Sequence, residues 1–181
     1  TLYGVELDQM SAKIAGYLYP EVNIENTGFE RTDYPDGYFD IAVGNVPFGD
    51  YRVNDPVYNR HGFLIHDYFF VKTLDKLRPG GVAAFITTKG TMDKENTKVR
   101  QYLFKRAELL GAVRLPNTAF KNAGTKVTSD ILFLQKREKE IAAPEWISVT
   151  EDAQGIPVNS YFAAHSEMIL GTMKEISGPY G

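Results

Sequence analysis

The sequence contains no cysteine, which excludes disulfide bonds and thiolate metal sites. Its three histidines, His61, His66 and His165, lack the spacing of a metal motif, so we expect none of them to bind a metal ion. No apolar run approaches the length of a membrane span. Glu6 and Asp8 near the first residue are not typical of a signal peptide. Together these absences predict a cytoplasmic chain.

The length of 181 residues and an apolar content of 43% favour one α/β domain, with or without a tail. The net charge of −3 is distributed unevenly. Residues 1–88 hold 7 Lys and Arg against 12 Asp and Glu, residues 89–139 hold 12 against 5, and residues 140–181 hold 1 against 6. The basic middle block suits a phosphate backbone. It is equally consistent with two amphipathic elements whose charged side chains are solvated.

One stretch combines a buried strand with unusual polar chemistry. Ile41–Val43 is a short, apolar run bounded by breakers, which predicts a strand. Gly44–Gly49 follows with the sequence Gly-Asn-Val-Pro-Phe-Gly, and Pro47 lacks the N–H group that a strand pairing needs. In open α/β sheets, ligands bind at the carboxyl ends of strands. We therefore expect a ligand site directly after this strand.

The residues of this loop suit an amino group attached to a flat ring. The side-chain oxygen of Asn45 accepts one N–H, and the Val46 carbonyl, restrained because it precedes a proline, accepts the other. Phe48 is placed to stack on the ring face. With both hydrogens held, the nitrogen lone pair points at an electrophile, so catalysis rests on positioning and electrostatics.

Asn45-Val46-Pro47-Phe48 resembles the Asn-Pro-Pro-Phe/Tyr motif of amino-methyltransferases that use S-adenosylmethionine, above all the N6-adenine DNA methyltransferases. Val46 replaces the first proline, but the family uses the carbonyl of that residue, and Pro47 still restrains it. The chain up to residue 137 is similar to the methylase region of large bacterial and phage methylase–helicase proteins. The other stretches that carry this resemblance are His66–Phe70, Arg78–Gly81, Thr87–Asp93 and Thr128–Arg137.

The resemblance implies a Rossmann-like methyltransferase fold, with a mostly parallel sheet and an antiparallel last strand. It also implies transfer of a methyl group from S-adenosylmethionine to N6 of an adenine flipped out of DNA. Residue patterns predict strands at 2–7, 22–25, 39–45, 82–87, 110–115 and 129–135. They predict helices at 9–18, 64–77, 98–109 and 161–170, and loops at 50–60, 88–96 and 116–128.

The resemblance also implies which residues hold the cofactor. Glu6, at the end of the first predicted strand, is the expected ligand of the ribose hydroxyls. Phe29 flanks the cofactor adenine or, equally, belongs to the core. Gly28 stands where the family often has an acid. No glycine-rich cofactor loop precedes Glu6, so we expect the chain to be a fragment that lacks the first strand of the fold and, alone, is inactive.

A missing first strand would leave unpaired backbone groups between the strands at 2–7 and 39–45. We expect the gap to close by direct pairing of these strands, by displacement of residues 1–35, or by a strand from a second copy.

The basic block supplies the expected DNA contacts, Lys89, Lys94 and Lys126. The expected partners are DNA and the rest of the parent polypeptide, including an upstream glycine-loop segment and a helicase region. We divide the chain into a partial methyltransferase domain, 1–140, and a C-terminal extension, 141–181. The alternatives are a protein glutamine or an RNA base as methyl acceptor, or a non-catalytic DNA-binding or docking module of a helicase–methylase polypeptide.

Overall fold

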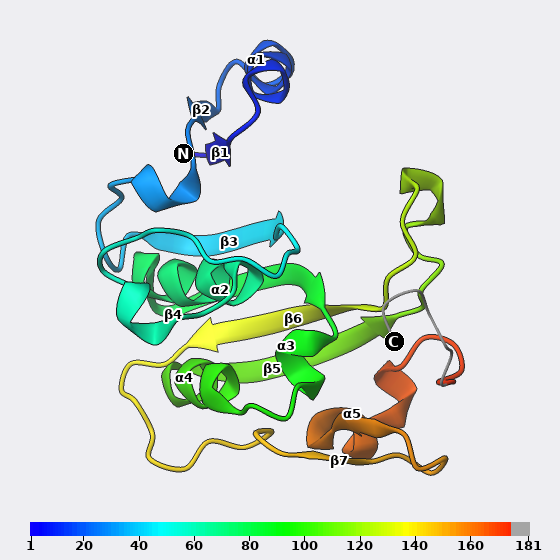
Figure 1. Ribbon diagram of the computed structural model, residues 1–181. Coiled ribbons are helices and arrows are strands. Elements are labelled where there is room, and N and C mark those ends of the chain that lie inside the picture. The colour runs from blue at the N-terminus through cyan, green and yellow to red at the C-terminus, as the bar shows by residue number, and fades with distance from the viewer. Residues whose placement is uncertain (175–181) are drawn as a thin grey trace.

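The computed structural model describes residues 1–174, and a four-stranded mixed sheet forms its centre (Figure 1). Its strands lie in the order β3 (Phe39–Asn45), β4 (Leu77–Thr88), β6 (Ser129–Lys136) and β5 (Ala107–Leu115). β3 and β4 are parallel, whereas β6 runs antiparallel to both β4 and β5. The carboxyl ends of β3, β4 and β5 therefore meet at one edge of the sheet, here called the carboxyl edge. The predicted α/β fold with an antiparallel last strand is confirmed.

Two helices, α2 (Ile65–Lys76) and α4 (Lys98–Arg106), lie side by side on one face of the sheet (Figure 1). Side chains alternate along each strand, so every second residue points toward the helices. The residues on that face are apolar. Its fully buried core includes Phe70, Val71, Leu74, Leu103, Ala83, Leu132 and Leu134. The predicted helix 98–109 is three residues too long, because the chain from Ala107 onward pairs with β6.

The opposite face of the sheet is largely open in the described residues. Val43, Ala84 and Phe133 lie opposite one another in register and share this face. Val43 is 74% exposed and Phe133 38% exposed, and Ile41 on the same face is 66% exposed. An apolar sheet face of this kind normally packs against another layer of structure.

The first 31 residues form a separate small unit. β1 (Tyr3–Glu6) and β2 (Asn23–Asn26) make a two-stranded parallel sheet around α1 (Gln9–Leu18), and a short 3₁₀ turn, η1 (Phe29–Arg31), follows. Figure 1 shows this unit standing away from β3.

Among the described residues, no strand pairs with the outer edge of β3. Of the three expected ways to close the gap, direct pairing of residues 2–7 with β3 is wrong, and displacement of the N-terminal residues is what the structure shows. The displaced unit contacts the start of β3 through aromatic side chains. The Tyr3 ring packs edge-on against Tyr34, Tyr38 and Phe39, and its hydroxyl is 3.0 Å from that of Tyr38.

The C-terminal segment packs onto the same core as the sheet. β7 (Val149–Glu151) and β8 (Pro157–Asn159) form a hairpin, followed by α5 (Ser160–Ala164) and η4 (Ser166–Met168). Val158 and Phe162 are fully buried with the main core. Of the predicted extension 141–181, residues 175–181 lie outside the described residues. In the part that the structure describes, no helix has the length and apolar character needed to span a membrane.

Candidate active site

The residues after β3 form a loop at the carboxyl edge, here called the motif loop (residues 45–49). The Val46 side chain is only 4% exposed and anchors the loop in the core. Its N–H donates to the Ile86 carbonyl of β4 at 3.1 Å, which extends the β3–β4 pairing by one residue. Pro47 then turns the chain out of the sheet. The local sequence thus buries one side chain and leaves its neighbours at the surface.

Both predicted acceptors of the motif loop are free among the described residues. The Asn45 side chain is exposed, and no protein hydrogen bond engages its amide. The Val46 carbonyl accepts no hydrogen bond either, although its N–H is fixed. Phe48 is 36% exposed at the same edge. The structure therefore brings Asn45, Val46 and Phe48 together on one loop, with two acceptors and one aromatic face unoccupied by protein.

The loop after the motif, residues 50–62, is held against α2. The Asp55 carboxylate, 4% exposed, accepts from the Tyr68 hydroxyl at 2.7 Å and from Lys72 Nζ at 3.2 Å. Tyr51 also accepts the first N–H of α2, from Ile65, at 2.9 Å. These contacts fix the exit of the motif loop to the amino end of α2. The loop predicted at 50–60 is therefore present, and the buried Asp55 holds it in a fixed position.

A buried polar cluster lies between the amino end of α2 and the residues after β4. Asp67, only 1% exposed, pairs with Lys94 and accepts from Thr91 Oγ1 at 3.3 Å. Thr91 Oγ1 is in turn 3.0 Å from Thr87 Oγ1. The loop predicted at 88–96 contains a short helix, α3 (Gly90–Asp93), and this cluster fixes it beside the amino end of α2.

His66 adjoins the cluster, and its Nδ1 atom is buried without a hydrogen-bond partner in residues 1–174. Burial lowers the pKa of His66, and the charge of Lys94 adds to that effect, although Asp67 and Asp50 oppose it. A neutral imidazole is therefore favoured. In the sequence, His66 and Asp67 belong to a stretch that carries the family resemblance, and no separate role is predicted for either. The signal for the buried cluster was Asp67, a charged residue among the apolar residues of the predicted helix 64–77.

The twelve bases of the middle block separate into three groups. Lys89 and Lys126 lie near the carboxyl edge on adjacent segments, since the Lys89 N–H donates to the Thr128 carbonyl at 3.2 Å. Lys94 lies there too, but its side chain is 29% exposed and paired with Asp67. The block therefore offers fewer free cations at this edge than its sequence charge indicated.

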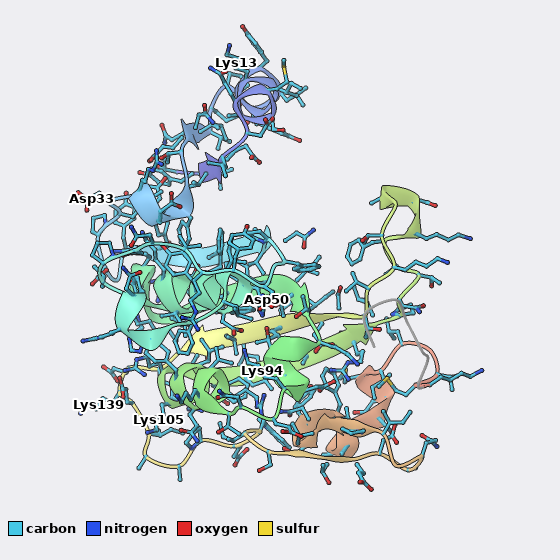
Figure 2. All side chains as sticks on the ribbon, viewed as in Figure 1. Lys13, Asp33, Asp50, Lys94, Lys105 and Lys139 are labelled. Carbon is cyan, nitrogen blue, oxygen red and sulfur yellow. The ribbon has the colours of Figure 1, made fainter. Side chains whose placement is uncertain are left out.

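Two bases of the block are buried, and others lie at the opposite end of the sheet. Arg100 is 0% and Arg114 1% exposed. Residues 136–139 follow β6 and sit beside the start of β4, away from the motif loop. Figure 2 shows Lys105 and Lys139 at that far end, well away from Asp50. A hollow of about 520 Å³, lined by residues such as Glu108, also lies there.

Of the two predicted cofactor residues, Glu6 ends β1 in the N-terminal unit, whereas Phe29 packs against α2 and the main core. One Glu6 carboxylate oxygen accepts from the Asp8 N–H at 2.8 Å, and the other has no partner among the described residues. The Phe29 ring packs against Phe69, with ring centroids 4.9 Å apart. The Glu30 carboxylate lies where a side chain on Gly28 would project, so a carboxylate is present at that place despite the glycine.

The Glu6 oxygen that lacks a partner among the described residues suits the ribose of S-adenosylmethionine, because a carboxylate accepts hydrogen bonds from ribose hydroxyls. The Glu30 carboxylate is paired with Arg31 Nε at 3.4 Å. Within residues 1–174, no group of three or more His, Asp or Glu side chains is arranged to hold a metal ion.

A family model described as N-6 DNA Methylase matches residues 1–161. The chain belongs to the N-6 DNA methylase family. It is 34% identical over 143 residues to the protein named Defense against restriction protein B of Escherichia phage P1. That match covers 76% of this chain and 6% of the phage protein, so the chain spans only a small part of its relative's length.

Solved structures confirm the fold. A protein of Vibrio vulnificus YJ016, described as a modification subunit of a type I restriction enzyme, has a TM-score of 0.63 at 18% identity, covering 92% of this chain and 40% of that one. A protein of Listeria monocytogenes, described as a class I S-adenosylmethionine-dependent methyltransferase, has a TM-score of 0.61 at 20% identity, covering 79% and 46%. The chain therefore has the S-adenosylmethionine-dependent methyltransferase fold of its family.

Proposed function

We propose that the chain is part of an enzyme that transfers a methyl group from S-adenosylmethionine to N6 of adenine in DNA. The observation that carries the proposal is the motif loop, where the Asn45 amide and the Val46 carbonyl stand unpaired at the carboxyl edge. Membership of the N-6 DNA methylase family supports the same acceptor atom.

The geometry of the motif loop supports the chemistry without a strong base. Asn45 and Val46 each accept a hydrogen bond from one N–H of the exocyclic amine, which turns the nitrogen lone pair out of the ring plane. On receiving the methyl group the amine would lose one proton, which passes to solvent water at this exposed loop. The fixed N–H of Val46 keeps its carbonyl in one place, so little reorganisation is needed during reaction. S-adenosylmethionine supplies an electrophilic methyl group when bound. In the proposed site Glu6 and Glu30 hold its ribose and adenine, with Phe29 beside the adenine ring.

The acceptor adenine has to leave the double helix to reach this loop. Inside a duplex, N6 is paired and the base faces are stacked, so enzymes that modify bases flip them into a pocket. Phe48, 36% exposed beside Asn45, offers the aromatic face on which a flipped base stacks. We therefore propose that Phe48 replaces part of the lost stacking.

The test is methyl transfer to DNA by the parent polypeptide with Asn45 replaced. Asn45→Ala and Asn45→Leu each remove the acceptor, Leu with a similar volume, and we expect transfer to fall at least about 100-fold. Asn45→Asp is the matched control, because it keeps an acceptor oxygen at the same position. Unchanged transfer by folded Asn45→Leu protein would refute the role of the amide.

DNA binding is tested by comparing lysines at the carboxyl edge with lysines at the far end of the sheet. Contacts between lysines and phosphates release counterions, so affinity should fall steeply with salt. Reversing Lys89, Lys94 and Lys126 to glutamate should weaken binding to all DNA sequences alike. Reversing Lys105 and Lys139 at the far end of the sheet is the control and should have little effect. Equal losses in both sets would place the DNA elsewhere.

One observation favours a non-catalytic role for the chain as it stands. Glu6 and Asn45 lie on separate sheets, and the outer edge of β3 is unpaired in the described residues. A chain in this arrangement would serve as a DNA-binding or docking module within a helicase–methylase polypeptide. Restoring upstream residues that include a glycine-rich loop should create cofactor binding if the enzymatic proposal is right. Calorimetry without any such gain would favour the docking module.

A further inference from the structure

The C-terminal segment, residues 146–162, is bound to α3 by hydrogen bonds from Asn159 to the Met92 carbonyl and to the Asp93 carboxylate. Asn159 is 0% exposed, and its Nδ2 donates to the Met92 carbonyl at 3.1 Å and to the Trp146 carbonyl at 3.0 Å. Its backbone N–H donates to Asp93 Oδ1 at 3.0 Å. The last carbonyls of a helix have no partner within it, and buried ones need a donor from elsewhere. Asn159 supplies that donor to the Met92 carbonyl from a position 67 residues further along the chain.

Two buried arginines add further hydrogen bonds at α3. Arg100 Nε donates to the Ile147 carbonyl at 2.7 Å, and its Nη1 to the Thr91 carbonyl at 3.4 Å. Arg114 Nη2 donates to Asp93 Oδ1 at 3.0 Å, and its Nε to Asp130 Oδ1 at 2.8 Å. The C-terminal segment, α4, β5 and β6 thus all meet at this four-residue helix.

Lys89 directly precedes the amino end of α3. The Lys89 carbonyl accepts from the Asp93 N–H at 2.9 Å, so Asp93 restrains Lys89 together with the Thr128 carbonyl, which accepts the Lys89 N–H at 3.2 Å. The Lys89 side chain is exposed at the carboxyl edge, directly after β4, the strand next to the one that carries the motif loop. A lysine held by its backbone at this edge presents its charge at a defined distance from the candidate site.

We propose that Asn159 is a positioning residue for DNA binding, which holds α3 and thereby presents Lys89 to a phosphate of the DNA backbone. This inference rests on the proposed function, because it takes DNA as the partner. Residues 146–162 would thus contribute to DNA binding at the carboxyl edge.

Asn159→Ser removes the side-chain bond to α3 and keeps a second role of Asn159. The Asn159 side-chain oxygen also caps α5 by accepting the Tyr161 N–H at 2.9 Å. Serine is a good N-cap and keeps this bond, but it lacks the two donors that reach Met92 and Trp146. Glu151→Ala, on the exposed part of the same hairpin, is the matched control. Asn159→Thr is the second variant if Asn159→Ser does not fold.

The salt dependence of DNA affinity distinguishes this role from general stabilisation. Asn159 carries no charge, so its loss should change the salt slope only through a lysine. We expect Asn159→Ser to weaken binding several-fold at low salt and to reduce the slope of log affinity against log salt by about 0.9, the value for one phosphate contact. In a Lys89→Ala background the same substitution should have no further effect. An unchanged slope, or effects that simply add, would overturn the inference.

Hydrogen exchange separates failure of the inference from failure of the proposed function. Amides of residues 89–94 should exchange at least about tenfold faster in Asn159→Ser than in Glu151→Ala, because α3 opens more often without the bond from Asn159 to Met92. Unchanged exchange overturns the inference, whatever the DNA affinity and its salt slope. Absence of DNA binding by the unaltered protein at low salt refutes the proposed function, and with it the presentation of Lys89. Faster exchange with an unchanged salt slope overturns only the inference.

Discussion

A single buried carboxylate anchors the loop that follows the motif, and its removal should be costly. Asp55 and Lys72 are each 4% exposed and pair at 3.2 Å, so Asp55→Ala leaves a buried ammonium without its carboxylate. Breaking a buried ion pair in this way costs about 3–5 kcal/mol. We expect a loss of about 3 kcal/mol, at the lower end of that range, because Lys72 Nζ retains the Glu30 and Thr32 carbonyls at 3.2 and 3.4 Å.

Urea unfolding followed by circular dichroism measures this loss. Asp50→Ala is the control, because Asp50 is exposed at the start of the same loop and should change the free energy of unfolding by less than about 0.5 kcal/mol. The double variant Asp55→Leu, Lys72→Met removes both charges and should recover most of the loss. A loss below about 1 kcal/mol in Asp55→Ala would refute the reasoning that this pair anchors the loop.

The same carboxylate gives a pH dependence of defined sign. Burial raises the pKa of Asp55, but the hydrogen bonds from Tyr68 and Lys72 outweigh burial and leave the pKa below its ordinary value. A carboxyl whose pKa is lower in the folded state stabilises the fold above its unfolded pKa of about 3.9. That stability is lost as pH falls through the lower folded pKa. Asp55→Ala should therefore lose less stability than the unaltered protein between about pH 4 and pH 2.

Three further predictions follow from the site. Val46→Pro should keep methyl transfer, because the carbonyl and its restraint remain, but it should lower the free energy of unfolding by about 1 kcal/mol through loss of the N–H bond to Ile86; lost activity in folded protein would contradict this. The lowered pKa of His66 should make the protein less stable as pH falls below about 6.5, and His66→Gln should flatten that slope; an unchanged slope in urea unfolding at pH 5–7 would show that another group causes it. Calorimetry of the chain with S-adenosylmethionine should show no measurable binding, and micromolar affinity would mean that Glu6 lies inside a complete cofactor site.

The sequence predicted the fold well where local signals were strong. The breakers after Val43 and the spacing before Ser129 placed β3, β6 and the antiparallel return. The strand predicted at 82–87 begins earlier, at Leu77, and includes Pro79–Gly81. Element ends were less accurate. Residues 107–109 continue a helical pattern, but pairing with β6 makes them strand, which is a long-range effect that no local window contains. The position of the N-terminal unit, which leaves the outer edge of β3 unpaired in the described residues, likewise depends on tertiary contacts.

The candidate site was predictable only in its motif. Asn45 and Val46 were identified from the order of residue types, whereas the buried network around α3 joins residues far apart in the chain. Arg114 illustrates the difference. In the sequence it adds one charge to a basic block, but in the structure it is 1% exposed and paired with Asp130. Burial alone would lower the pKa of Arg114, but the bonds and charges of Asp130 and Asp93 outweigh burial and raise it.

The identity of the methylated product tests the central proposal most directly. The parent polypeptide is incubated with S-adenosylmethionine carrying a labelled methyl group and with equal amounts of DNA, RNA and a glutamine-containing protein. Mass spectrometry of the hydrolysed products then identifies the labelled compound. We predict N6-methyladenine from DNA, formed by the unaltered protein and lost in Asn45→Leu. Label in methylglutamine or in an RNA base, or label in DNA that survives Asn45→Leu, would contradict the assignment of this loop to adenine N6.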